Sequence, residues 1–88
     1  MGAPIITLAM LAGLAMPTNE YDHTPHVAVE IVEYDPQLLR AACNDWRQDI
    51  LFGCYIAGQI RIRNDMTPAA RAKVLRHEYG HVNGWSHD

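Results

Sequence analysis

Three histidines and a glutamate lie close together near the C-terminal end of the chain, in the stretch HEYGHVNGWSHD at residues 77–88. His77 and His81 are four residues apart, so on a helix they share one face, one turn from each other. Two imidazoles in that arrangement can bind one tetrahedral Zn²⁺ together. Glu78 follows His77 and would project beside the metal, where a base for an activated water is needed.

A third ligand is expected where the helix ends. Gly84 accepts a positive φ at little cost, so the chain can turn sharply after it. His87 follows three residues later and could then swing back to the metal. Three protein nitrogens leave the fourth coordination position open, and an open position distinguishes a catalytic zinc site from a structural one.

The complete pattern, H-E-x-x-H-x-x-G-x-x-H-D, resembles the extended zinc-binding motif of the metzincin clan of metallopeptidases. The resemblance implies that His77, His81 and His87 are the zinc ligands and that Glu78 is the general base. It implies that Gly84 forms the turn, and Asp88 matches an acidic residue that also occurs after the third histidine in the clan. The expected function is therefore a zinc-dependent hydrolase, a metallopeptidase acting on a peptide or protein substrate.

Other interpretations stay open. Metzincins carry a Met-containing turn downstream of the third histidine, and the chain has no residue after Asp88. Its outline is more similar to the small zincin-like proteins of phages and bacteria, although a fragment of a larger metzincin would give the same pattern. A small zinc-binding structural or interaction protein without catalysis needs only the histidines.

The segments that precede the motif predict an α+β domain of order β-α-β-β-α. Alternation predicts a strand over residues 26–34, and Asp35-Pro36 begins a helix that runs to Gln48. Two antiparallel strands, 50–57 and 59–63, follow with a turn at Ala57-Gly58. In zincins the corresponding edge strand pairs with an extended substrate, and strand 59–63 is expected to do the same.

Helical spacing predicts which side chains are buried. The first helix has a buried stripe in this prediction, formed by Leu38 or Leu39, Ala42, Trp46 and Ile50. Thr67-Pro68 begins the last helix, which runs to about Asn83. Its predicted sheet-facing stripe comprises Ala72, Leu75, Tyr79 and Val82, whereas Ala70 and Val74 are placed on the metal side.

The N-terminal part of the chain differs in composition from the rest. Residues 5–15 carry no charge and are too few for the ~20 apolar residues of a membrane span. Residues 1–15 therefore indicate a signal peptide cleaved after Ala15, or a buried N-terminal segment. Residues 16–25 are expected to be a linker, and residues 26–88 the zincin-like domain.

Composition and cysteine content limit the partners and the compartment. With 88 residues, the chain is long enough for one domain, and domains of this size often add a disulfide or a metal. Cys43 and Cys54 are expected to form a disulfide, with two buried thiols as the alternative, and a disulfide favours an extracytoplasmic or secreted protein. The net charge of −3 argues against a nucleic-acid partner. We expect a monomer with no stable membrane span.

Overall fold

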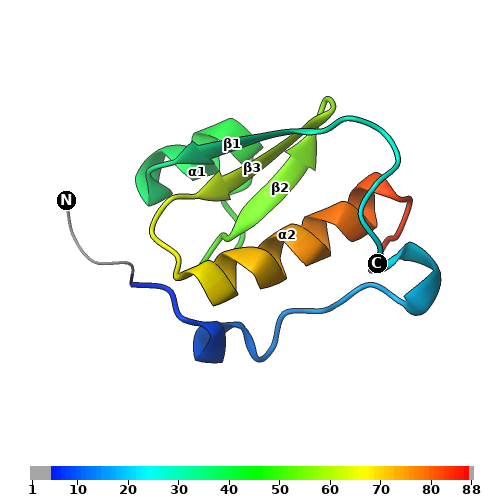
Figure 1. Ribbon diagram of the computed structural model, residues 1–88. Coiled ribbons are helices and arrows are strands. Elements are labelled where there is room, and N and C mark those ends of the chain that lie inside the picture. The colour runs from blue at the N-terminus through cyan, green and yellow to red at the C-terminus, as the bar shows by residue number, and fades with distance from the viewer. Residues whose placement is uncertain (1–4, 88) are drawn as a thin grey trace.

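A three-stranded mixed sheet forms the centre of the fold (Figure 1), in a computed structural model that describes residues 5–87. The strands lie in the order β1 (Glu30–Tyr34), β3 (Gln59–Arg63) and β2 (Gly53–Ile56). β1 is parallel to β3, and β2 is antiparallel to β3. Ala57 and Gly58 both have positive φ, the conformation that two-residue hairpin turns require. The predicted α+β class and the order β-α-β-β-α are confirmed.

The two helices cover opposite faces of this sheet. α1 (Pro36–Cys43) packs on the face where Cys54 and Arg61 are cross-strand neighbours, and Arg61 donates a hydrogen bond to the Ala42 carbonyl. α2 (Pro68–Val82) packs on the other face. The main core lies beneath α2, and its buried members are Ile6, Leu11, Ile60, Ile62, Met66, Ala70 and Val74.

Several predicted boundaries and orientations are wrong. α1 ends at Cys43, not Gln48, because Asn44 adopts the left-handed conformation with φ of 50°. Trp46 and Ile50 are consequently not part of a buried helical stripe, and Trp46 is 65% exposed. The strand predicted over 26–34 begins only at Glu30, and that predicted over 50–57 comprises Gly53–Ile56.

The predicted role of β3 as a substrate-binding edge strand is also wrong. β3 lies between β1 and β2, so both of its backbone edges are already hydrogen-bonded to neighbours. Within residues 5–87, the edge strand on the hairpin side is β2, which has β3 as its partner on one side only.

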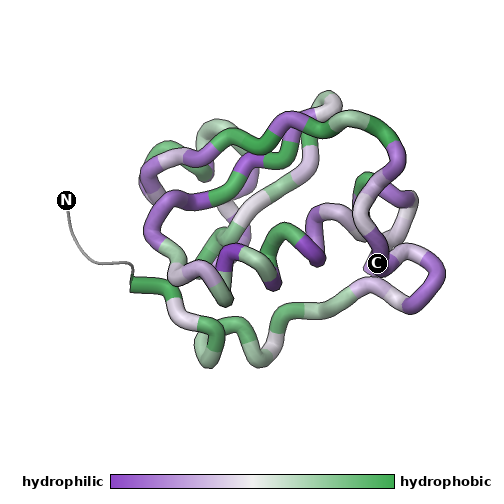
Figure 2. Tube along the Cα trace, in the orientation of Figure 1, coloured by the Kyte–Doolittle hydropathy of each residue, from purple (hydrophilic) through white to green (hydrophobic). Residues whose placement is uncertain are grey.

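The N-terminal segment runs along α2 on the side away from the sheet (Figure 1). It contains two short 3-10 helices, η1 (Leu8–Leu11) and η2 (Asn19–Tyr21). Much of it is apolar (Figure 2), and Ile6 and Leu11 are buried. Residue 6 forms an isolated parallel bridge with Met66, and Lys73 donates a hydrogen bond to the Leu11 carbonyl at 2.9 Å. Cleavage after Ala15 stays a prediction, and it would remove these contacts from the mature protein.

The same segment continues to clasp α2 beyond residue 15. Pro17 is buried against Gly80, where an added Cβ would lie 2.7 Å from the Pro17 Cβ. Arg76 forms an ion pair with Asp22 at 2.5 Å. Asn83 donates hydrogen bonds to the carbonyls of Tyr21 and His23, both at 2.8 Å. Residues 16–25, predicted as a linker, therefore contact α2 at several points.

The predicted disulfide is confirmed. Cys43, the last residue of α1, is bonded to Cys54 in β2. Around it lies a second core cluster that contains Leu39 and Leu51. The bond fixes β2 to α1 on the face opposite α2. None of the helices within residues 5–87 combines the length and hydropathy that crossing a bilayer requires.

Candidate metal centre

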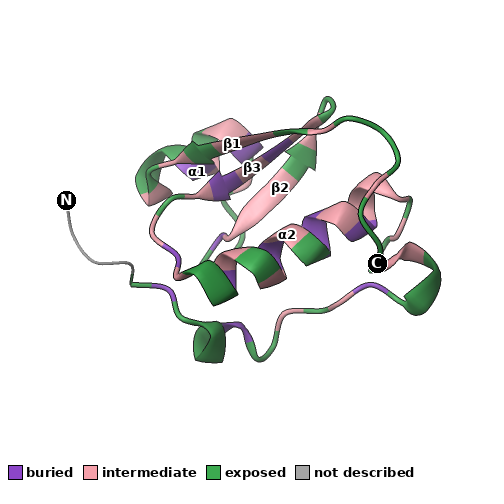
Figure 3. Cartoon of the chain, in the orientation of Figure 1, coloured by how far each residue is buried: buried purple, intermediate pink, exposed green. Residues whose placement is uncertain are grey.

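α2 positions three of the four side chains predicted to do chemistry. The helix begins where Thr67 accepts a hydrogen bond from the Ala70 amide at 3.3 Å, with Pro68 at its first position. His77, Glu78 and His81 lie in its last two turns. Buried and exposed positions alternate along the helix (Figure 3), and His77 and Glu78 are both buried.

The turn that follows α2 places the fourth side chain, His87, near the other three. Gly84 has a φ of 104°, as expected for the residue that turns the chain after the helix. The Trp85 amide then donates a hydrogen bond to the Gly80 carbonyl at 2.9 Å. This turn returns the chain, so that the His87 ring lies 5.3 Å from the His77 ring and 4.9 Å from the His81 ring.

The three histidines could hold a metal ion. One ring nitrogen from each of His77, His81 and His87 lies within 4.8 Å of the other two. Glu78 does not belong to this group, which consists of the three histidines alone within residues 5–87. Asp88, expected behind the third histidine, lies outside the described residues.

Hydrogen bonds to the main chain orient two of the rings. His77 Nδ1 is 2.6 Å from the Ala15 carbonyl, and His81 Nδ1 is 2.9 Å from the Trp85 carbonyl. A carbonyl only accepts, so both Nδ1 atoms must carry the proton. In a neutral imidazole the Nε2 atom is then an unprotonated acceptor, the form that binds a metal.

The two Nε2 atoms face each other across 3.1 Å. With both Nδ1 atoms protonated and both rings neutral, this contact would bring two lone pairs together, so either the Nε2 proton of one imidazolium ring or a metal ion must lie between them. Tetrahedral zinc with Zn–N distances of ~2.0–2.1 Å would hold two nitrogens about 3.3 Å apart. The observed separation is close to that value, so the residues present fit a metal ion.

Burial favours the neutral form of His77. Desolvation lowers the pKa of His77, and this effect outweighs the hydrogen bond to the Ala15 carbonyl, which raises it. The neighbouring His81 and His87 lower the pKa further, because positive charges repel. A neutral imidazole is the state that metal binding requires, so the metal would displace few protons from this ligand.

Glu78 occupies a different environment from an ordinary surface carboxylate. It is 4% exposed, and its Oε1 atom has no hydrogen-bond partner within the described part of the chain. Burial raises the pKa of Glu78 to about 7. A buried carboxyl oxygen without a partner is costly for a fold and is characteristic of functional sites.

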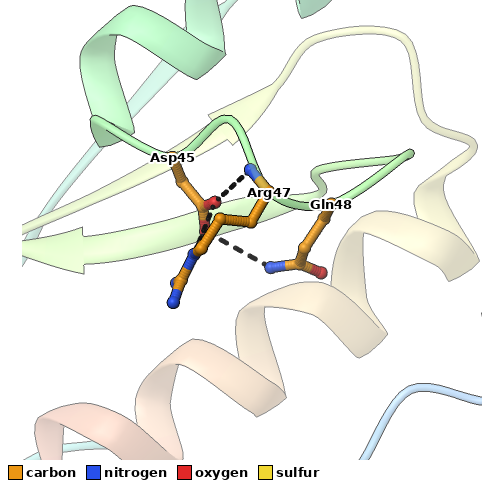
Figure 4. Close-up of polar contacts among 3 residues, drawn as sticks. All are labelled: Asp45, Arg47 and Gln48. Atoms are coloured by element: carbon orange, nitrogen blue, oxygen red, sulfur yellow. Dashed lines mark hydrogen bonds and ion pairs between the residues drawn. The ribbon is translucent and has the colours of Figure 1, made fainter.

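Glu78, His77 and His87 line one cavity of about 230 Å³. The N-terminal segment contributes one wall of it through residues 13–15, and the chain between α1 and β2 contributes another. The second wall is held in shape by Asp45, whose carboxylate accepts hydrogen bonds from Arg47 and from the Gln48 amide (Figure 4). Gln48 itself lines the cavity, together with Leu51, Phe52, Gly53 and Val74.

The predicted faces of α2 are right in part. Ala70 and Val74 lie on the metal side as predicted, and Val74 lines the cavity with His77, but this side is the fully buried one. Of the stripe predicted to face the sheet, Leu75, Tyr79 and Val82 pack against the core, whereas Ala72 is exposed. His77 continues the same buried face toward the C-terminal end of the helix. The metal centre therefore lies on the buried face of α2, between the sheet side and the N-terminal segment.

The remaining tyrosine and histidine rings near α2 and β2 lie outside the centre or pack against the core. Tyr79 is partly buried against the core, and Tyr55 is exposed on β2. The rings of His23 and His26 are 5.2 Å apart, and neither belongs to the metal-binding group. Sequence reasoning missed the Ala15 and Trp85 carbonyls, because a main-chain acceptor has no side-chain signature.

No protein-family model, curated protein or solved structure matches this chain.

Proposed function

We propose that this chain is a zinc-dependent hydrolase that cleaves peptide bonds, with a small zincin-like domain and a metal site similar to that of the metzincins. The observation that carries the proposal is the facing pair of Nε2 atoms, together with the cavity that His77 and Glu78 both line. The Glu78 Oε1 atom is buried and has no hydrogen-bond partner among residues 5–87. A ligand set of imidazoles suits zinc, although copper, iron and nickel also accept it. Three nitrogens leave one coordination position open.

Zinc, when bound, would act as a Lewis acid and lower the pKa of a water molecule at the open position from ~15.7 to near 7. His77, His81 and His87 would hold the ion, and the Ala15 and Trp85 carbonyls would keep the first two rings in the metal-binding tautomer. This leaves the proton transfers to a side chain of the cavity.

Glu78 is suited to those transfers. Its carboxylate would take a proton from the attacking water as the new C–O bond forms at the scissile carbonyl carbon. It would then return that proton to the leaving nitrogen as the C–N bond breaks. Burial raises the pKa of Glu78 to about 7 without a metal, and a nearby zinc ion would lower it, so the carboxylate form would be available to accept a proton near neutral pH.

The substrate would approach along β2. Gly53 in this strand and Phe52 immediately before it line the cavity that contains Glu78. The outer edge of β2 has no strand partner within residues 5–87. An extended peptide could therefore add to that edge by main-chain hydrogen bonds and present a peptide bond to the metal centre.

The proposed compartment is outside the cytoplasm. A disulfide joins Cys43 and Cys54, and such bonds form and persist in oxidising environments. We therefore infer an extracytoplasmic or secreted protein. The proposed site requires that residues 5–15 are retained, because the Ala15 carbonyl orients His77 and because Ile6 and Leu11 belong to the core. We propose that the protein acts as a monomer on peptide or protein substrates.

Two measurements test the proposal. Elemental analysis after dialysis should find about one zinc per chain, as expected for one three-histidine site, and His81→Ala should lose it. Peptide libraries analysed by mass spectrometry should show cleavage that a chelator abolishes and added zinc restores.

Glu78→Gln is the decisive variant, because it keeps the side-chain shape and removes the base. It should bind zinc as the wild type does but lose roughly 10²–10⁴-fold in cleavage rate, the usual contribution of acid–base catalysis. Equal rates in the two proteins would exclude Glu78 as the base. Tight zinc binding without cleavage across broad libraries would favour the structural or interaction protein instead.

A further inference from the structure

Trp85 lies in the turn between α2 and the third histidine, and its ring contacts all three members of the metal-binding group. Its ring is stacked on the His81 ring, with centroids 4.9 Å apart and an interplanar angle of 18°. It meets the His77 ring edge-on at 5.2 Å and the His87 ring at 5.1 Å. Outside the histidines themselves, no other aromatic ring of residues 5–87 is in ring contact with the group.

Two features of the chain hold this indole in place. Gly84 turns the chain, and the Trp85 amide donates a hydrogen bond to the Gly80 carbonyl at 2.9 Å. Gly80 also leaves room for the ring, since an added Cβ would lie 3.0 Å from Trp85 Cε3. The indole is thus fixed against the last turn of α2 by contacts that do not involve the histidines.

The three imidazoles need such support because they are not buried to the same extent. His77 is buried, but His81 is only half-buried and His87 is exposed. The hydrogen bond from His81 Nδ1 to the Trp85 carbonyl sets the tautomer of that ring. The ring could still swing about this bond, and a stacked indole removes that freedom.

A metal ion would strengthen the stacking contact. Coordination draws electron density from an imidazole and gives its ring partial positive charge. The face of an indole is electron-rich and attracts positive charge more strongly than the face of a phenyl ring. Holding ligands in the binding geometry before the ion arrives raises affinity, because less rotamer freedom is lost on binding.

We propose that Trp85 is a positioning residue that preorganises the three histidines for the metal, through its stacked ring and its main-chain carbonyl. The inference rests on the metal site of the proposed function and not on hydrolysis, so it would survive a finding that the protein binds zinc without catalysis.

The test measures zinc affinity by competition with a chromophoric chelator. Trp85→Leu keeps an apolar side chain and the carbonyl but removes the aromatic ring. It should lower zinc affinity about 10- to 100-fold, the usual effect of changing a group that supports a metal ligand. Trp85→Phe should recover most of that loss, because a phenyl ring can still stack on His81. Trp46→Leu is the matched control, since Trp46 is 65% exposed, and it should bind zinc like the wild type.

A second readout does not depend on the stability of the Trp85 variants. In the Trp46→Phe background Trp85 is the single tryptophan, because the chain has two. Zinc should then change the tryptophan emission in a saturable way at one equivalent, and His81→Ala should abolish the change. Unchanged emission on full zinc loading would overturn the proposal, as would a folded Trp85→Leu protein with wild-type affinity. If Trp85→Leu loses zinc affinity and Trp85→Phe does not recover it, an aromatic ring at this position is not sufficient. That result would contradict the stacking role.

Discussion

Replacing Glu78 by Gln should stabilise the metal-free protein at neutral and alkaline pH. Burial raises the pKa of this carboxyl from 4.5 to about 7 in the folded state. Between these values the folded chain therefore holds a proton that the unfolded chain has released. The free energy of unfolding of the wild type must fall as pH rises through this range. The difference in pKa corresponds to about 3 kcal/mol at pH 8 relative to pH 4.

Urea unfolding in the presence of a chelator measures this effect, with the disulfide intact and the pH varied from about 4 to 8.5, a range that spans both pKa values. Burial lowers the pKa of His77, so its contribution has the opposite sign and is lost as pH falls through the ordinary histidine value. The informative quantity is therefore the stability of Glu78→Gln minus that of the wild type at each pH. This difference should grow toward alkaline pH.

Glu20→Gln provides the control, because Glu20 lies exposed on η2. Its stability should follow the wild type at every pH. A difference between Glu78→Gln and the wild type that stays constant from acid to alkaline pH would refute the reasoning. It would mean that the Glu78 carboxyl titrates alike in the folded and unfolded chain and is not buried in the folded protein.

Two further predictions concern contacts that stabilise the fold. Replacing Cys43 and Cys54 together by Ala should lower the free energy of unfolding by about 3 kcal/mol, the loop-entropy value for a bridge across 11 positions. A urea midpoint equal to that of the oxidised wild type would contradict this prediction. Gly80→Ala should destabilise the protein by about 1–3 kcal/mol although Ala favours helices, because its Cβ would overlap Pro17 and crowd Trp85. Increased thermal stability of Gly80→Ala would show that the N-terminal segment does not pack on α2.

Features that depend on neighbouring residues could be predicted from the sequence. The four-residue spacing of His77 and His81 and the glycine at 84 are local signals, and the structure brings His77, His81 and His87 together as those signals indicate. The hairpin at Ala57-Gly58 and the two Pro-initiated helices follow from local backbone preferences in the same way. The Cys43–Cys54 bond follows from an even cysteine count in a small domain.

Features that depend on contacts between distant segments could not be predicted from the sequence. The most buried face of α2 differs from the predicted one, because it includes His77 and Glu78, which hydrophobic periodicity counts as polar and exposed. The acceptor for His77 lies 62 residues away in a segment whose composition suggested export. The end of α1 depended on a single residue, Asn44, in the left-handed conformation, to which helical periodicity is insensitive.

The packing of the N-terminal segment along α2 has a consequence for the order of folding. Its contacts join residues 54–62 positions apart, whereas the β2–β3 hairpin and the helices form from near neighbours. Contacts of long sequence separation close late, since the intervening chain must first lose its freedom. We therefore expect α2 to form, and His77 and His81 to be able to bind a metal ion, before the hydrogen bond between His77 and the Ala15 carbonyl forms. A metal ion bound at that stage would have low affinity and would exchange rapidly with ions in solution. Slow exchange of the bound metal would then indicate that the N-terminal segment has packed on α2.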